Sequence, residues 1–257
     1  MGEGQKQVGS VQGGTKMGQV LQRYVSNELT HFVGGNERTD DERYRLLVEI
    51  LKSGLLRSSK YSPTRPAGYS RLDTDVTKAL SSNEVYHGTY VCFCDIPVAD
   101  LEIHIRKYSG FGLSFSKDFL ARQGASPIFY IAQNSRSTPL NPQTRAEEFD
   151  EAFADFNVLY GAAQVPAATG DRFFHFLEWE VFSRLKFFEH TRGDADQKNY
   201  YMEREWRVVG KVCFTLDDVS RIIIPRQYAR QLRQHVPDYF GQITFAPTME
   251  QLWCAPS

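Results

Sequence analysis

The segment YYMEREWRV occupies residues 200–208 and combines charged, aromatic and apolar side chains in one short run. Its residue types predict a strand within a longer strand-forming stretch, Tyr200–Phe214. Side chains on a strand alternate between two faces, so one face carries Glu203, Glu205 and Arg207. The other face carries Met202, Arg204, Trp206 and Val208. This charged strand is the candidate functional site, and the remaining sequence is interpreted around it.

Two carboxylates about 7 Å apart on one strand face repel each other unless water or cations lie close to them. Glu203 and Glu205 in that arrangement are suited to binding ribose hydroxyls and to stabilising a developing positive charge. The alternative is an exposed strand whose carboxylates form ion pairs with a neighbouring strand. The residues alone leave both interpretations open.

The segments before this strand alternate between strand and helix patterns. Val25–Phe32 predicts a first strand, and a helix is expected after the N-cap candidates Asp40 and Asp41, ending at Gly54. Residues 58–88 are rich in Pro, Gly and hydroxyl side chains, which predicts a functional loop or lid. Further strands are predicted at Tyr90–Cys94, Phe111–Phe115 and Pro127–Ala132, with helices at Val98–Tyr108 and Ser116–Arg122.

An aromatic region and a strand-rich end complete the predicted order. The aromatic region consists of two Phe-containing helices, Arg145–Tyr160 and Asp171–Phe188. This order lacks a regular βαβ repeat and predicts an α+β fold in one domain over residues 21–257. Residues 1–20 are polar and Gly-rich, and we expect a disordered N-terminal leader there. After Tyr200–Phe214, strands are predicted at Arg221–Ile224 and Ile243–Phe245, with a helix at Arg226–His235 between them.

The composition is that of an ordinary globular protein, with 41% hydrophobic residues and a formal net charge of -1 over 257 residues. That charge provides no whole-chain attraction to nucleic acid or to an anionic membrane. The longest apolar runs are too short for a bilayer span, and the first residues lack the apolar core of a secretory signal. We therefore expect a cytoplasmic protein with no membrane partner.

The four cysteines, Cys92, Cys94, Cys213 and Cys254, are too few and too irregularly spaced for a disulfide framework. Cys92 and Cys94 share a strand face, as two zinc ligands would, but no matching His or Cys pair accompanies them. We expect reduced, buried thiols and no metal. The sequence also lacks the phosphate-loop, dinucleotide-binding, zinc-protease and nucleophile-elbow motifs.

Five separated segments of the chain form one pattern: Leu29–Phe32, Ile50–Leu56, Cys92–Pro97, Phe111–Phe115 and Glu203–Arg207. Together these segments resemble the AbiGi family of abortive-infection phage-resistance proteins, described as the antitoxin half of a toxin–antitoxin pair. The resemblance covers most of residues 24–225. It implies a role in antiviral defence and a cognate toxin as partner.

A more distant resemblance is to ADP-ribosyltransferases, including the DarT-like toxins that modify DNA. It implies an ADP-ribosyltransferase-like mixed sheet core, with the aromatic region as a helical insertion and NAD as the substrate. It places His31 on the first strand beside the nicotinamide-side ribose, Glu203 as a positioning residue and Glu205 as the catalytic one. Cleavage of NAD passes through an oxocarbenium-like state, which a fixed carboxylate stabilises. The serine–threonine–serine middle motif of these enzymes has no obvious counterpart here.

Three further residues are candidates for the same site. Arg57 offers a cation for a phosphate, although a solvated loop charge is the commoner role. Tyr108 offers a ring that stacks on nicotinamide or adenine, with a core or surface aromatic as the alternative. Asp95 is either a site residue at a strand end or the N-cap of the next helix.

Three functions remain open from the sequence. The first is a phage-defence ADP-ribosyltransferase that uses NAD and modifies a nucleic acid or protein acceptor. The second is a non-catalytic antitoxin or regulator on the same fold that binds a toxin or DNA. The third is a nucleic-acid-processing enzyme that uses the two carboxylates for another reaction. The carboxylate pair favours an enzyme, and the near-zero net charge disfavours a DNA-binding regulator.

Overall fold

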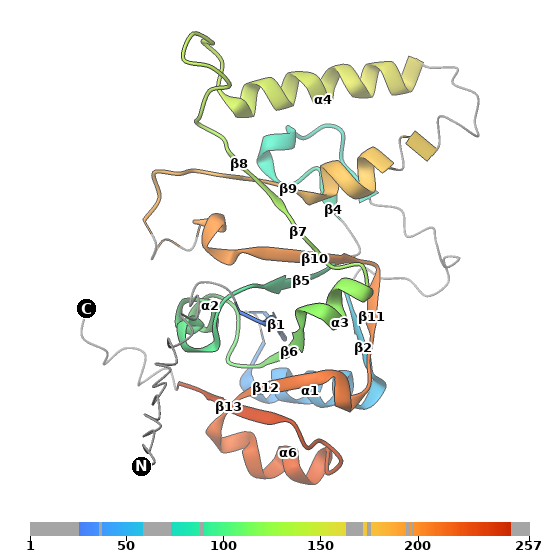
Figure 1. Ribbon diagram of the computed structural model, residues 1–257, viewed down its shortest axis with the longest axis vertical. Helices are drawn as coiled ribbons and strands as arrows, with labels where there is room; N and C mark the ends of the chain where they lie inside the picture. Colours follow the sequence, from blue (N-terminus) through green and yellow to red (C-terminus); the bar gives the residue numbers. More distant parts are fainter. Residues whose placement is uncertain are drawn as a thin grey trace, which may run out of the picture.

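The computed structural model describes residues 26–35, 38–58, 73–87, 90–162, 172–173, 176–193, 196 and 198–247. Its centre is a seven-stranded mixed sheet flanked by helices, which confirms the predicted α+β class (Figure 1). The leader predicted at residues 1–20 lies outside the described residues. In spatial order the strands are β13 (Gln242–Ala246), β12 (Val219–Pro225), β6 (Gly112–Ser116), β1 (Glu28–Phe32), β5 (Tyr90–Cys94), β10 (Glu205–Val209) and β7 (Ser126–Pro127).

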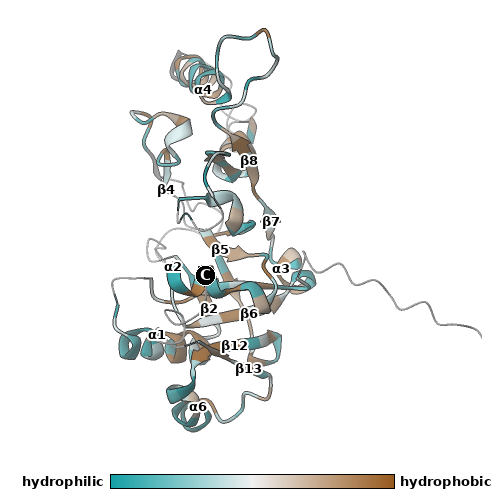
Figure 2. Cartoon of the chain, turned by 90° about the vertical axis from the view of Figure 1, so that its left-hand side faces the viewer, coloured by the Kyte–Doolittle hydropathy of each residue, from teal (hydrophilic) through white to brown (hydrophobic). Residues whose placement is uncertain are grey.

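The central strands β1 and β6 contribute buried side chains to the core of the sheet. Leu29, Leu113 and Phe115 are completely buried, and Leu29 pairs directly with Phe115 across the β1–β6 ladder. Neighbouring strands are antiparallel except β12 and β13, which run parallel. Figure 2 shows hydrophobic residues along the strands and hydrophilic ones on the outer turns of the helices. The sheet therefore forms the rigid base on which the site residues of β1, β5 and β10 are placed.

Helix α1 (Asp40–Ser53) packs on this sheet through Tyr44, Leu47 and Leu51. Thr39 caps its start, rather than the predicted Asp40 or Asp41. The Thr39 hydroxyl accepts the Glu42 N–H, and the Glu42 carboxylate accepts the Thr39 N–H at 2.8 Å. The two aspartates instead lie in the first turn, where acidic side chains complement the helix dipole.

The end of α1 is formed by Gly54, as the sequence predicts. Gly54 has a φ of 62°, in the left-handed region that side chains with a Cβ rarely adopt. A Cβ at this position would lie 2.4 Å from the carbonyl oxygen of Phe214. The chain then enters β2 (Leu55–Arg57), which pairs with β11 (Lys211–Cys213) in a separate two-stranded sheet.

An aromatic region lies beyond the edge of the main sheet that β10 and β7 form, in the upper part of Figure 1. It contains α4 (Arg145–Ala162) and the parallel strands β8 (Phe129–Ala132) and β9 (Leu185–Phe188). The predicted helical aromatic insertion is therefore confirmed for α4. Its own hydrophobic cluster is formed by Leu80, Val85, Tyr86, Phe153 and Phe187.

The second predicted aromatic helix, Asp171–Phe188, is wrong in its last part. Residues 177–181 form a π-helical turn, residues 182–184 form a 3₁₀ turn, and residues 185–188 form β9. Asn83 holds the β9 backbone, because its side chain accepts the Phe187 N–H at 2.8 Å and donates to the Phe187 carbonyl at 3.0 Å. This contact joins residues far apart in sequence, so the local aromatic spacing gives no sign of it.

Two of the predicted strands are each interrupted. Pro127–Ala132 divides into β7, which pairs with β10, and β8, which pairs with β9 outside the main sheet. Tyr200–Phe214 divides into a 3₁₀ turn (Tyr200–Glu203), β10 and β11. The breaks lie at Arg204, with a φ of 43°, and at Gly210, with a φ of 90°. Positive φ values of this kind end an extended strand.

The shorter elements follow the sequence more closely, with local changes. The described part of the predicted 58–88 loop contains the strand pair β3 (Asp73–Thr74) and β4 (Tyr86–His87) and a 3₁₀ turn, Leu80–Ser82. Residues 59–72 and 88–89 lie outside the described part, and the lid function stays a prediction. The helix predicted at Val98–Tyr108 begins as a 3₁₀ turn (Val98–Asp100), which α2 (Glu102–Lys107) follows. Two further predicted helices are short: α3 (Lys117–Arg122) and α6 (Ala229–His235).

Candidate functional site

A cavity of about 390 Å³ lies where β1, β5 and β10 approach the aromatic region. β1 contributes His31, β10 contributes Glu205 and Arg207, and β9 contributes Lys186. Aromatic walls are formed by Phe32, Tyr90, Tyr108 and Tyr200. The structure therefore brings the predicted first-strand residue and the charged β10 segment to one concave site.

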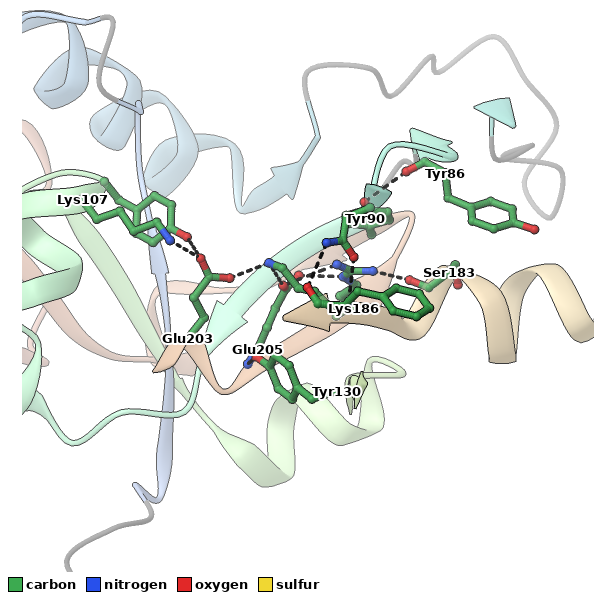
Figure 3. A network of polar contacts seen from close by, with 12 residues as sticks. Tyr86, Tyr90, Lys107, Tyr130, Ser183, Lys186, Glu203 and Glu205 are labelled. Atoms are coloured by element: carbon green, nitrogen blue, oxygen red, sulfur yellow. Dashed lines mark hydrogen bonds and ion pairs between the residues drawn. The ribbon is translucent and has the colours of Figure 1, made fainter. Parts of the chain in front are cut away.

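Glu205 is a buried carboxylate with two cationic partners (Figure 3). Its Oε1 accepts a hydrogen bond from Arg207 Nε at 2.6 Å, and its Oε2 accepts one from Lys186 Nζ at 2.8 Å. Burial raises the pKa of the Glu205 carboxyl, but Arg207 and Lys186 outweigh burial and lower this pKa to about 2. Glu205 is therefore ionised at neutral pH.

Glu203 is a second buried carboxylate in the same network. Its Oε1 accepts from Lys107 Nζ at 2.6 Å and from the Tyr108 hydroxyl, and its Oε2 accepts from Lys186 Nζ at 2.6 Å. Burial raises the pKa of Glu203, and these donors, with Lys186 foremost, lower it below its usual value. Both glutamates are thus stabilised as anions, and they share one ammonium group.

The two carboxylates reach the cavity by a different route from the predicted one. Glu203 ends the 3₁₀ turn and does not lie on the strand with Glu205. The left-handed turn at Arg204 nevertheless directs both side chains to Lys186, which lies between them in Figure 3. The expectation of one strand face carrying all three charged residues is wrong for Glu203 and holds for Glu205 and Arg207.

Three cations surround the two carboxylates, so this group of five side chains carries a net charge of about +1 at neutral pH. Burial lowers the pKa of Lys186, but Glu205 and Glu203 outweigh burial and raise it. The Tyr200 ring centre lies 4.6 Å from Lys186 Nζ and 5.1 Å from Lys107 Nζ. The cavity is therefore lined by fixed charges of both signs and by aromatic rings.

His31 enters the cavity in its neutral form. Its Nδ1 lies 2.8 Å from the Cys92 carbonyl oxygen, which can only accept, so Nδ1 carries the proton and Nε2 is left as an acceptor. Burial lowers the pKa of the imidazole, although the hydrogen bond to Cys92 acts in the opposite direction. A neutral imidazole orients ligands through hydrogen bonding rather than through charge.

The remaining predicted site residues are placed differently from one another. Tyr108 lines the cavity, where its hydroxyl donates to Glu203 and its ring lies 5.9 Å from that of Phe32. A role for Arg57 in binding phosphate stays a prediction, and Arg57 is not among the described residues that line this cavity. The physical reason is strand pairing, because β2 places Arg57 opposite Lys211 in the separate two-stranded sheet.

A second cavity, of about 640 Å³, adjoins the first and shares Glu205 and His104 with it. Asp95 lines this second cavity and is not a helix N-cap, because the 3₁₀ turn begins after Pro97. The Asp95 carboxylate accepts the Ser26 N–H at 3.1 Å and Lys117 Nζ at 2.7 Å. These contacts tie the start of β1 to α3.

Lys107 and Lys186 are the site residues that sequence reasoning missed. Two buried carboxylates require nearby cations, but 30 Lys and Arg residues are available in the chain and nothing local selects these two. Lys186 lies in a segment expected to be helical. Residues 185–188 are Leu, Lys, Phe and Phe, which do not alternate, so this run gives no strand signal that sets Lys186 apart.

Metal and disulfide chemistry find no support in the part of the chain that the structure describes. No group of three His, Cys, Asp or Glu side chains there is arranged to hold a metal ion. Cys92, Cys94 and Cys213 are free thiols, and Cys254 lies outside the described residues. None of the described helices combines the length and the apolar character needed to cross a bilayer.

Comparison with known proteins gives a family match. A family model described as "Putative abortive phage resistance protein AbiGi, antitoxin" matches residues 74–236, more than half of the chain. The matched range includes Cys92–Pro97, Phe111–Phe115 and Glu203–Arg207, whereas Leu29–Phe32 and Ile50–Leu56 precede it. No curated protein and no solved structure matches the chain.

Proposed function

The chain belongs to the AbiGi family of abortive phage resistance proteins, and we propose that it acts in phage defence by binding NAD in the cavity beside Glu205 and transferring its ADP-ribose. The observation that carries this proposal is the meeting of His31 and Glu205 in one cavity, from strands separated by β5 in the sheet. A first-strand histidine facing a late-strand carboxylate is the arrangement that the transferase resemblance implies.

The proposed reaction assigns Glu205 an electrostatic role. The bond between the ribose C1′ and the nicotinamide nitrogen breaks, and nicotinamide leaves with the bonding electron pair. The ribose then carries oxocarbenium character, which an ionised carboxylate stabilises. An acceptor nitrogen or oxygen attacks C1′ and loses its proton to solvent. With a pKa of about 2, Glu205 remains an anion throughout and is a poor general base.

The surroundings of Glu205 support a ligand with phosphates and flat rings. The charged side chains Glu203, Glu205, Lys107, Lys186 and Arg207 sum to about +1, which favours an anionic ligand. The cavity also presents aromatic side chains on which a nicotinamide or adenine ring can stack. A volume of about 390 Å³ is in the range of small-molecule sites.

A plaque assay tests the link between this cavity and defence. Cells that produce the wild-type protein, Glu205→Gln or the control Glu84→Gln are challenged with phage. Glu84 is exposed and pairs with Lys78 at the surface, so its change alters charge equally without touching the cavity. We expect protection to be lost with Glu205→Gln and retained with Glu84→Gln. Full protection by a folded Glu205→Gln protein contradicts the enzymatic proposal.

A second function is favoured by a different observation. Both oxygens of Glu205 are already engaged, by Arg207 and Lys186, as expected of a buried structural ion network. In this reading the protein is a non-catalytic antitoxin or regulator that binds a toxin or DNA, in keeping with the family description. Copurification of a cognate toxin with both wild-type protein and Glu205→Gln supports this second function.

A further inference from the structure

Lys186 occupies a special position among the cations of the cavity, because its ammonium joins both carboxylates. Lys186 Nζ lies 2.6 Å from Glu203 Oε2 and 2.8 Å from Glu205 Oε2 (Figure 3). The two glutamates follow one another in the Tyr200–Val209 segment, whereas Lys186 comes from β9 in the aromatic region. One flexible side chain from another part of the fold thus donates to the Oε2 atom of each carboxylate.

Arg207 is fixed in place by more contacts than Lys186. Its Nε donates to Glu205 Oε1 at 2.6 Å, its Nη2 donates to Glu205 Oε2 at 3.4 Å, its Nη1 donates to the Ser183 carbonyl, and its Cζ lies 4.5 Å from the Tyr90 ring centre. A guanidinium held at several points is pre-organised. Arg207 therefore keeps its short contact with Glu205 Oε1 and its longer contact with Oε2 when Lys186 leaves.

Glu203 also keeps a partner when Lys186 moves away. Lys107 Nζ and the Tyr108 hydroxyl both hold Glu203 Oε1, the oxygen that Lys186 does not contact. Each carboxylate thus retains a charged donor on its Oε1 atom. Movement of the Lys186 ammonium frees Glu203 Oε2 and leaves Glu205 Oε2 with only the 3.4 Å contact from Arg207 Nη2. Neither anion is left unpaired, which limits the cost of the movement.

We propose that Lys186 recognises the phosphate groups of the ligand by leaving Glu205 for a phosphate oxygen, so that Glu205 Oε2 becomes the acceptor for a ribose hydroxyl. This inference rests on the proposed function, because it assumes a ligand that carries both ribose and diphosphate. One charge-assisted hydrogen bond is exchanged for another, and the hydroxyl replaces the ammonium at the carboxylate. Lys186 is then a positioning residue that determines specificity.

The exchange predicts selection against ligands without phosphate. A nucleoside offers the hydroxyl but no anion for the displaced ammonium. Lys186 therefore remains on Glu205 and competes with the ribose hydroxyl for Glu205 Oε2. A ligand with a diphosphate offers both partners at once. Replacing Lys186 with Gln also reduces the net charge of the five-residue group from about +1 to about 0, which removes its attraction for anions.

Calorimetric titration separates this specific role from a structural one. ADP-ribose and nicotinamide riboside, which lacks the diphosphate, are titrated into the wild type, Lys186→Gln, Lys186→Arg and the surface control Lys78→Gln. We expect Lys186→Gln to weaken ADP-ribose binding by about ten- to a hundredfold, the usual effect of losing a charged hydrogen bond. Nicotinamide riboside binding should not weaken, and Lys186→Arg should restore most of the ADP-ribose affinity.

The outcomes distinguish failure of this inference from failure of the proposed function. Equal ADP-ribose affinity in the wild type and Lys186→Gln, or equal weakening of both ligands, overturns the role of Lys186 alone. A wild-type protein that binds neither ADP-ribose nor NAD overturns the proposed function and this inference with it. Inorganic pyrophosphate provides a test that needs no variant: it should displace ADP-ribose from the wild type and leave nicotinamide riboside bound, and the opposite result contradicts the inference.

Discussion

Arg207 Nε lies 2.6 Å from Glu205 Oε1, although the two residues are separated by one position on the same strand. Both side chains are buried, and both leave β10 on the same face. Neighbouring charges of opposite sign on one face hold each other in place before any ligand arrives. The carboxylate of Glu205 is thus oriented by its own strand, and the pKa of this carboxyl is lowered by the same contact.

The first prediction concerns acid stability. The pKa of Glu205 is about 2 in the folded protein, below its ordinary value of 4.5, so the folded state favours the ionised form. This stabilisation is complete above pH 4.5 and is lost as the pH falls through 2. The lowered pKa of Glu205 contributes about 3 kcal/mol to the free energy of unfolding at neutral pH.

Denaturant unfolding between pH 2 and pH 6 measures this effect. We expect the free energy of unfolding of the wild type to fall across this range, and the fall to be smaller for Glu205→Gln, which cannot titrate. Glu84→Gln serves as the matched control, because Glu84 is exposed. Identical pH dependence in the wild type and Glu205→Gln contradicts the assignment of Glu205 as a strongly stabilised anion.

The second prediction concerns Arg207→Lys, which preserves the charge but not the shape of the side chain. Lysine cannot reach Glu205, the Ser183 carbonyl and the Tyr90 ring together, as Arg207 does. We expect the free energy of unfolding to fall by about 1–3 kcal/mol, from the loss of buried charged hydrogen bonds. Thermal unfolding measures this, with the exposed Arg230→Lys as control. Equal stabilities of the two variants contradict a shape-dependent role for Arg207.

The third prediction concerns thiol reactivity. Burial raises the pKa of the Cys92 thiol, with a further contribution from Glu205, and burial raises the pKa of Cys94 to about 12. Cys213 is exposed. Iodoacetamide at pH 8 should therefore modify Cys213 in the folded protein, and Cys92 and Cys94 only after unfolding. Peptide mass mapping follows each site. Rapid modification of Cys92 in the folded protein indicates that the cavity opens more widely than the structure shows.

Parts of the fold are encoded locally, and these parts are predictable from sequence. Leu113 and Phe115 lie in Phe111–Phe115, where large apolar side chains alternate with small residues between turn residues, and such a pattern forms a strand. The end of α1 follows from Gly54, because only glycine readily adopts its left-handed conformation there. The pairing of Glu205 with Arg207 follows from the two-residue repeat of a strand.

The cation arrangement of the site could not be predicted, because it depends on long-range contacts. Lys186 is brought to the glutamates by the pairing of β8 with β9 and by the contact of Asn83 with Phe187. Glu203 reaches the cavity through a positive φ at Arg204, a residue type that gives no local sign of that conformation. The position of Arg57 also depends on a long-range contact, since its strand pairs outside the main sheet.

The central claim is that Glu205 stabilises the cleavage of NAD in this cavity, and nicotinamide release tests it most directly. Purified wild-type protein and Glu205→Gln are incubated with NAD, alone and with phage lysate, and free nicotinamide is quantified by chromatography. We predict release by the wild type and a rate lower by about two to three powers of ten in a folded Glu205→Gln protein. Equal rates in the two proteins, or no release by the wild type under either condition, contradict the claim.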